Sequence, residues 1–317
     1  MKEIGGYIEL ERFSLPMLHE GALALNSGRN ALAYLIHARG IKKLLLPRFL
    51  CDSVPKVCER EGADYTLYDI GRDFLPAQDF DLEEGEWLYL VNYYSQLSNE
   101  QLAAFAERYG RVIVDNAQSC FQKPLPGVDT LCTCRKYFGV PDGAFLYTDA
   151  ILREELPRDE SFSRMGFLLG RFERTANEFY LDFRANEERF EALPVMAMSA
   201  LTRNLLHGID YAAVERRRRE NFAYLHERLK DLNGLTLRET GTFMYPLLLE
   251  NGAALRKKLQ AEKIYIPTLW PDVFQMSEPD STEYAMAENI LPLPIDQRYT
   301  TEDMAYMLHK LEQLIKE

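Results

Sequence analysis

Short runs of apolar residues alternate with helical patterns along the first half of the chain. Within the helical patterns, apolar residues recur at the spacing of one face of an amphipathic helix. This alternation predicts an α/β domain built on a large, mostly parallel sheet with helices on its faces. The expected strands are 42–47, 63–69, 86–94, 111–117 and 143–149, and the expected helices are 28–40, 53–62 and 98–110.

The second half of the chain follows a different pattern. Residues 151–205 are irregular to helical, and a long helical pattern then runs from Asp210 to Leu232. Beyond it, short strands alternate with helices again, as in a smaller α/β unit. We therefore expect a large domain over residues 1–205, with its N-terminal segment against the small domain, and a small domain over residues 206–317. The strands expected in the small domain are 235–239 and 244–250, and its later helices are 252–263 and 300–317.

The composition of the 317-residue chain is ordinary for a globular protein, with 47% hydrophobic and 27% charged residues. Its formal net charge of −12 argues against nonspecific nucleic-acid binding, which depends on a basic surface. We interpret the one basic cluster, at 215–221, as a solvated helix face. There is no apolar run long enough to span a bilayer and no signal-peptide core at the N-terminus. The sequence therefore predicts a cytoplasmic protein with neither nucleic-acid nor membrane partners.

The chain contains five cysteines, an odd number in a sequence of intracellular type. Structural disulfides are therefore not expected. The pair Cys132-x-Cys134 lacks the spacing of a metal site, and no histidine lies near it in the sequence. We expect buried free thiols and no metal site. The five residues are Cys51, Cys58, Cys120, Cys132 and Cys134.

Residues 27–30, Ser-Gly-Arg-Asn, open the expected helix 28–40. Backbone N–H groups at the start of a helix have no partner within it, and they can hold an anion such as phosphate. A helix start of this kind is more often a simple cap, so the feature alone does not identify a ligand.

A second candidate is Asp115, which follows the apolar run 111–114. Ligands of open α/β sheets bind at the carboxyl ends of the strands, so an acid at this point is well placed to face one. The alternative is an aspartate that caps the next turn.

Lys136 is the third candidate, because it lies between two runs that have the character of buried strands. A lysine buried without a partner is costly, so its position needs a reason. The three candidates together suit pyridoxal 5′-phosphate (PLP). Its phosphate needs a helix N-terminus, its ring nitrogen needs a carboxylate, and its aldehyde needs a lysine amine.

Several motifs of the chain resemble those of the DegT/DnrJ/EryC1/StrS sugar aminotransferases, a family of fold-type-I PLP enzymes. The similarity covers nearly the whole chain, because segments 198–229 and 289–311 also resemble the family. It implies a large PLP-binding domain, a small C-terminal α/β domain and a homodimer whose active site lies at the subunit interface. The principal motifs are SGRNAL (27–32), LPRFLCDSV (46–54), VIVDNAQS (112–119) and TCRKYFGVPDGA (133–144).

The resemblance implies a role for each matching residue. Lys136 would form the Schiff base and shuttle the proton between substrate and cofactor. Asp115 would pair with the pyridinium nitrogen, and Gln118 would lie near the 3-hydroxyl of the ring. The remaining implied contacts are Gly28, Arg29, Asn30 and Thr133 around the phosphate and Asn92 near the ring.

The chain departs from the family pattern at three places. Cys51 occupies the position of the aromatic residue that stacks on the ring, so either Phe49 or the thiol would take that place. The family's GEGG after the lysine is PDGA here, at 141–144. At 195–198 the sequence VMAM lacks the asparagine and arginine through which the neighbouring subunit would contact the site. The substrate and the contacts across the dimer are therefore left open.

The function implied by the resemblance is an aminotransferase that moves an amino group from glutamate onto a keto-sugar, in a nucleotide-linked form. Two alternatives stay open. One is a different fold-type-I PLP reaction, such as transamination of an amino acid or C–S cleavage. The other is a PLP-fold protein with a structural or regulatory role and little turnover. The sequence identifies neither the sugar nor the carbon that is aminated.

Overall fold

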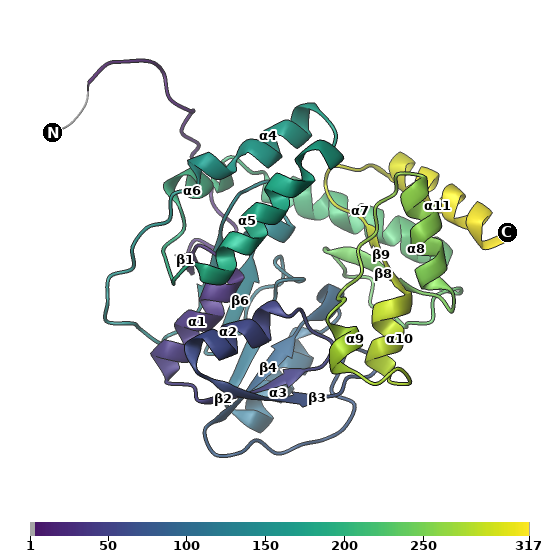
Figure 1. Ribbon diagram of the computed structural model, residues 1–317, viewed down its shortest axis with the longest axis horizontal. Helices are drawn as coiled ribbons and strands as arrows, with labels where there is room; N and C mark the ends of the chain where they lie inside the picture. Colours follow the sequence, from purple (N-terminus) through teal and green to yellow (C-terminus); the bar gives the residue numbers. More distant parts are fainter. Residues whose placement is uncertain (1–3, 317) are drawn as a thin grey trace.

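The computed structural model describes residues 4–316 and contains a seven-stranded and a two-stranded sheet (Figure 1). The large sheet has the order β1-β7-β6-β5-β4-β2-β3. Strands β2 to β6 run parallel, whereas β7 is antiparallel to both β6 and β1. The expected α/β domain with a mostly parallel sheet is therefore confirmed. The bounds are β1 Leu23–Leu25, β2 Lys43–Pro47, β3 Asp64–Tyr68, β4 Glu86–Val91, β5 Val112–Asp115, β6 Asp129–Thr133 and β7 Ala144–Tyr147.

Helices flank this sheet, and local sequence signals define their ends. The Ser27 hydroxyl caps α1 by accepting the N–H of Asn30, and Gly40 ends the helix in the left-handed conformation. Ser98 and Gln101 form a reciprocal capping box at the start of α3. The helices are α1 Gly28–Arg39, α2 Ser53–Glu61, α3 Asn99–Tyr109, α4 Gly166–Glu173, α5 Tyr180–Ala192 and α6 Ala200–Leu206, with short 3₁₀ segments at Tyr93–Ser95, Cys134–Lys136, Phe162–Arg164 and Asn177–Phe179.

The C-terminal elements form a second layered unit beside the large sheet (Figure 1). Strand β8 pairs antiparallel with β9, and α7 and α11 pack around this pair. The predicted strand at 235–239 is wrong. This segment is irregular because its backbone N–H groups bond to side chains, including Arg238 to Gln96 Oε1. The elements are α7 Tyr211–Leu229, β8 Met244–Leu248, α8 Gly252–Ala261, α9 Val273–Met276, α10 Thr282–Asn289, β9 Ile290–Pro294 and α11 Thr301–Lys316.

Two hydrophobic cores underlie the two sheets. The smaller joins Leu225 of α7 to Leu291 of β9 and Leu308 of α11. The larger lies on the seven-stranded sheet but also takes in Leu235 and Phe243 from the C-terminal part. The two parts are therefore in close contact, and the boundary between residues 205 and 206 stays a prediction. Within residues 4–316, no helix is long and apolar enough to cross a membrane.

The N-terminal segment extends from the body of the protein near α6 (Figure 1). Its last part is fixed by backbone contacts, because the Leu15 N–H donates to the His207 carbonyl. The Phe13 N–H donates to Asn204 Oδ1 at 3.0 Å. These contacts hold the segment at the junction of α6 and the residues that lead into α7.

Strand register determines where the candidate residues meet. Val91 of β4 pairs with Asp115 of β5, and Asp115 pairs with Leu131 of β6. The three parallel neighbours therefore end at one edge of the sheet. Asn92, Asp115 and Thr133 all lie at this edge, which is the edge where open α/β sheets bind ligands.

Candidate active site

Asp115 is the last residue of β5, and only 8% of its surface is exposed. Its Oδ2 accepts the Tyr89 hydroxyl at 2.8 Å, and its Oδ1 accepts the Ala117 N–H at 2.7 Å. Burial raises the pKa of Asp115, while the charge of Lys136 and these hydrogen bonds act in the opposite direction. Asp115 is thus a buried acid that gains from a nearby positive charge.

Lys136 ends the 3₁₀ turn that follows β6. Its side chain is exposed, so the expectation of a buried charge is wrong: the turn after β6 directs it out of the core. The amine lies 5.6 Å from the centre of the Phe243 ring. Its charge also acts on the pKa of Cys51, as it does on that of Asp115, so Lys136 lies close enough to both side chains for the charges to interact.

Gln118, three residues after Asp115, has an unpaired donor. Its Oε1 accepts the Tyr94 N–H at 2.8 Å, but its Nε2 is buried and has no partner among residues 4–316. A buried donor without an acceptor costs about 1–3 kcal/mol. An acceptor supplied by a bound molecule would remove that cost, and the 3-hydroxyl oxygen of PLP is such an acceptor.

The backbone that holds Gln118 is itself strained. Tyr94 and Ser95 have φ angles of 51° and 63°, which are unfavourable for residues other than glycine. The Ser95 hydroxyl donates to the Gln118 carbonyl at 2.8 Å. Strained residues of this kind persist where surrounding contacts fix them, and they concentrate at functional sites.

The N-terminus of α1 lies against the segment that leads to Lys136. A Cβ placed on Gly28 would lie 3.6 Å from the Cβ of Thr133, so the two residues are direct neighbours. In the described part of the chain, the N–H groups of Gly28 and Arg29 have no hydrogen-bond partner. Two free N–H groups beside a threonine form a suitable cradle for a phosphate.

The side chains of Asn30 and Asn92 are engaged with other parts of the protein. Asn30 donates to Asn26 Oδ1 and the Pro194 carbonyl, and its own oxygen accepts from Arg60. Asn92 donates to Gln122 and Asn116, and its oxygen accepts from the Leu97 N–H. Both residues shape the backbone around the site, and their direct contact with a cofactor stays a prediction. The other predicted residues, Gly28, Arg29, Asp115, Gln118, Thr133 and Lys136, surround the same edge of the sheet.

Phe49 and Cys51 were the two candidates for stacking on the ring. Phe49 is fully buried, with its ring 5.4 Å from that of Trp270 and 5.5 Å from that of Tyr93. Cys51 is half-buried, and its pKa is raised by burial and lowered by Lys136. Of the two, the Cys51 thiol therefore lies on the side of Lys136.

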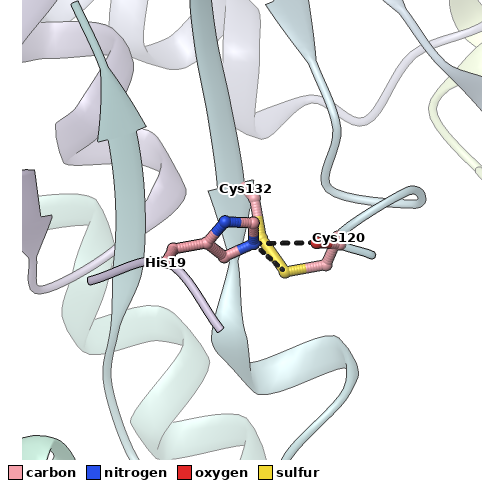
Figure 2. A group of neighbouring side chains, drawn as sticks. All are labelled: His19, Cys120 and Cys132. Atoms are coloured by element: carbon pink, nitrogen blue, oxygen red, sulfur yellow. Dashed lines mark hydrogen bonds between the residues drawn. A yellow bond between two sulfur atoms is a disulfide. The ribbon is translucent and has the colours of Figure 1, made fainter. Parts of the chain in front are cut away.

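Cys120 and Cys132 form a disulfide, so the expectation of five free thiols is wrong for these two residues (Figure 2). The loop after β5 returns beside β6 and brings their Cα atoms to 5.5 Å. The bond joins the loop that carries Gln118 to the strand that carries Thr133. Sequence spacing alone gives no sign of this proximity.

His19 lies against this disulfide, although it is distant in sequence (Figure 2). Its Nε2 donates to the Cys120 carbonyl at 2.8 Å, and its Nδ1 accepts the Tyr147 hydroxyl at 2.9 Å. Burial lowers the pKa of His19. His19 is thus a neighbour of Cys132 in space although it is distant in sequence, but sulfurs bonded to each other offer no thiolate to a metal.

Arg218 corrects the interpretation of residues 215–221 as a solvated face, because this side chain is only 1% exposed. It donates to the carbonyls of Thr242 and Tyr137 and to Gln297 Oε1. The helix thereby holds the residue that follows Lys136. A signal was present, since Arg218 precedes Phe222 by four residues on the face of α7 that packs into the core.

Comparisons with known proteins identify the fold. No family model matches the chain, and no curated protein is similar to it in sequence. Among solved structures, NtdA from Bacillus subtilis with bound cofactor PMP has a TM-score of 0.66 at 16% identity, over 95% of this chain and 74% of that one. A DegT DnrJ EryC1 StrS aminotransferase from Brucella abortus has a TM-score of 0.61 at 17% identity, over 93% and 86%. DesI in the presence of its TDP-sugar product has a TM-score of 0.62 at 16% identity, over 92% and 80%. The chain therefore has the fold of these three proteins.

Proposed function

We propose that this protein is a PLP-dependent aminotransferase that moves an amino group from glutamate onto a nucleotide-linked keto-sugar. The observation that carries the proposal is the convergence of Lys136, Asp115 and the unpaired amide of Gln118 at one edge of the sheet. The free N–H groups at the start of α1 add a place for the phosphate. Each of these groups matches a different part of one cofactor.

The residues present fit PLP, because their existing contacts leave the groups that would bind it available. Lys136 is exposed and has no carboxylate partner within residues 4–316, so its amine is available to bond the aldehyde. Asp115 would accept a hydrogen bond from the protonated ring nitrogen, and the cation would stabilise its charged form. Gln118 Nε2 would donate to the 3-hydroxyl oxygen. When bound, the cofactor supplies the electron sink for the carbanion formed during amino transfer.

The chain's own groups then perform the remaining tasks. Lys136 would hold a proton and move it between the substrate carbon and the cofactor. Tyr89 and the Ala117 N–H would keep the Asp115 carboxylate oriented toward the ring. The Ser95 and Tyr94 contacts would fix Gln118, so that its amide keeps one direction.

The sugar substrate is supported by the neighbouring structures, since DesI was determined with its TDP-sugar product. A homodimer is supported by apolar side chains exposed on α4 and α5. Phe172 is 92% exposed and Leu181 is 80% exposed. Large apolar side chains that are exposed together are typical of a protein–protein interface. The glutamate donor and the cytoplasmic location stay predictions from the sequence.

The first experiment tests the cofactor. We expect the purified protein to absorb visible light after PLP is added, and borohydride reduction to fix the cofactor on a peptide containing Lys136. The Lys136→Ala variant should lose both signals, whereas Lys257→Ala, which removes an exposed lysine on α8, should keep them. A wild-type protein that binds no PLP would favour the structural or regulatory alternative.

The second experiment tests the reaction. Adding glutamate to the loaded protein should release 2-oxoglutarate and leave the cofactor in its amino form, which can be extracted and quantified. A loaded protein that leaves glutamate unchanged would refute the aminotransferase with this donor and favour another PLP reaction.

A further inference from the structure

Three charged side chains gather beside the N-terminus of α1. Arg29 is the second residue of this helix, Arg135 directly precedes Lys136, and Glu187 projects from α5. Both guanidinium nitrogens Nη1 and Nη2 of Arg135 bond to the Glu187 carboxylate, the second at 3.0 Å. The Arg29 Nη1 lies 3.8 Å from Glu187 Oε2. The side chains of the three residues are only 14–25% exposed.

Glu187 interacts more strongly with Arg135 than with Arg29. Arg135 takes both carboxylate oxygens in a bidentate pair and also lies 4.4 Å above the Phe190 ring. At 3.8 Å, the contact of Arg29 is an ion pair but not a hydrogen bond. The Nε atoms of both arginines are buried without a partner in the described chain, but only Arg135 has its two Nη atoms bonded to Glu187. The hydrogen-bonding capacity of Arg29 is therefore largely unspent.

The cluster of Arg29, Arg135 and Glu187 carries an unbalanced positive charge. One carboxylate faces two guanidinium groups, so the cluster carries one positive charge in excess. The next acid, Asp52, feels the charge of Arg29 but is paired with Lys56 at 2.6 Å. A partly buried positive charge with free donors favours an anion that approaches from outside the chain.

The place of this excess charge indicates the anion. Arg29 directly follows Gly28 in the first turn of α1, where the N–H groups of both residues are free in the described chain. Gly28 in turn contacts Thr133. The positive end of the helix dipole and the excess guanidinium charge thus act on one region.

We propose that the Arg29 guanidinium binds the phosphate monoester dianion of the cofactor, and that Glu187 is the internal counter-ion that holds the arginines in place before the phosphate binds. The inference rests on the proposed function for the identity of the cofactor. The phosphate site itself stands on the residues described above. Arg29 is thereby a binding residue through its side chain, in addition to its backbone, and Glu187 is a positioning residue.

The test compares PLP with pyridoxal, which has the same aldehyde but no phosphate. We expect Arg29→Ala to weaken PLP binding at least tenfold and pyridoxal binding less than twofold, because only PLP carries the phosphate to which the guanidinium makes a charge-assisted hydrogen bond. Arg29→Lys should recover part of the loss. Arg184→Ala on α5 is the control, since that side chain is half-exposed and pairs only with Glu188 in the described chain. Equal losses for both aldehydes, or no loss for PLP, would overturn the proposal.

Glu187→Gln provides a readout that needs no catalysis. Without the Glu187 charge, Arg29 and Arg135 repel each other, so the cofactor-free variant should have a lower melting temperature than the wild type. Added inorganic phosphate should then raise the melting temperature more in Glu187→Gln than in the wild type, and this extra rise should vanish in the double variant with Arg29→Ala. An equal response to phosphate in the wild type and in Glu187→Gln would refute the counter-ion role.

The two proposals fail in different ways. If the protein is not a PLP enzyme, neither aldehyde will bond to Lys136, but inorganic phosphate will still stabilise the wild type through Arg29. If Arg29 is not a phosphate ligand, PLP will bond to Lys136 with the same affinity in Arg29→Ala as in the wild type.

Discussion

The hydrogen bond from Tyr89 to Asp115 should affect the ionisation of the Asp115 carboxyl group. Burial raises the pKa of Asp115, and the Tyr89 hydroxyl partly offsets this effect by donating to the carboxylate. Removing the hydroxyl in Tyr89→Phe should therefore raise the pKa further. Hydrogen bonds to a charged group are worth about 1.5–3 kcal/mol, against about 0.5–1.5 kcal/mol for a neutral pair. The hydroxyl therefore favours the charged carboxylate by about 1 kcal/mol, and the variant should bind this proton more tightly than the wild type.

The sign of the pH dependence follows from linkage. The folded pKa of Asp115 lies above its ordinary value of 3.8, so the folded protein binds this proton more tightly than the unfolded chain. The contribution of Asp115 to stability is therefore greatest below that ordinary value and declines as the pH rises through the folded pKa. Tyr89→Phe should deepen the decline, and its loss of stability should be larger at neutral pH than in acid.

Urea unfolding of the cofactor-free protein at several pH values between about 4 and 8 measures this effect. The control is Tyr94→Phe, because the Tyr94 hydroxyl is also buried but has no hydrogen-bond partner within residues 4–316. Its effect on stability should not change with pH. If the loss in Tyr89→Phe were equally independent of pH, the hydroxyl would not be a partner of the charged carboxylate, and the reasoning would fail.

Three further predictions concern the frame of the site. Arg218→Ala should lower the free energy of unfolding by about 2–4 kcal/mol, because the Thr242 carbonyl loses its side-chain donor and the Tyr137 carbonyl keeps only the one from Gln297. Arg217→Ala, at a half-exposed position, should change it by less than about 0.5 kcal/mol. Replacing Cys120 and Cys132 by serine, or adding reductant, should lower the free energy of unfolding by about 2–4 kcal/mol. Free thiols found at both positions of the oxidised protein by mass spectrometry would contradict the disulfide. Gly143→Ala should lose about 1–3 kcal/mol in thermal unfolding, because its φ of +115° disfavours a side chain and the new Cβ would lie 3.1 Å from Thr202; an unchanged melting temperature would refute this.

Much of the large sheet and of the candidate site could be predicted, and for the same reason. Strongly apolar runs fix the parallel strands, and the carboxyl ends of parallel strands meet at one edge. Asp115, which ends such a run, is placed at that edge by topology alone, and Lys136 lies three residues after the last residue of β6. Gln118 came from the family resemblance, and its unpaired amide could be seen only in the structure.

The misses have a common physical origin in contacts between distant segments. The apolar alternation of 235–239 resembles a strand, but its N–H groups are satisfied by the side chain of Gln96 and by local contacts. The Cys120–Cys132 disulfide depends on the path of a loop, which residue spacing does not define. Arg218 lies in a run of four arginines, and the run concealed that one of the four lies on the apolar face of α7. In each case a tertiary contact overrode a local pattern.

Departures from ordinary structure also distinguish a ligand site from an inert fold. Asp115 is a buried acid with a raised pKa, Gln118 keeps a buried donor unpaired, and Arg29 keeps another. Tyr94 and Ser95 hold a strained backbone beside them. Each feature costs folding free energy, and a protein with only a structural role would gain nothing from placing them together. One ligand with a cationic ring nitrogen, an acceptor oxygen and a phosphate would compensate the buried acid and both unpaired donors at once, which is why their convergence favours a cofactor-binding enzyme over a structural protein.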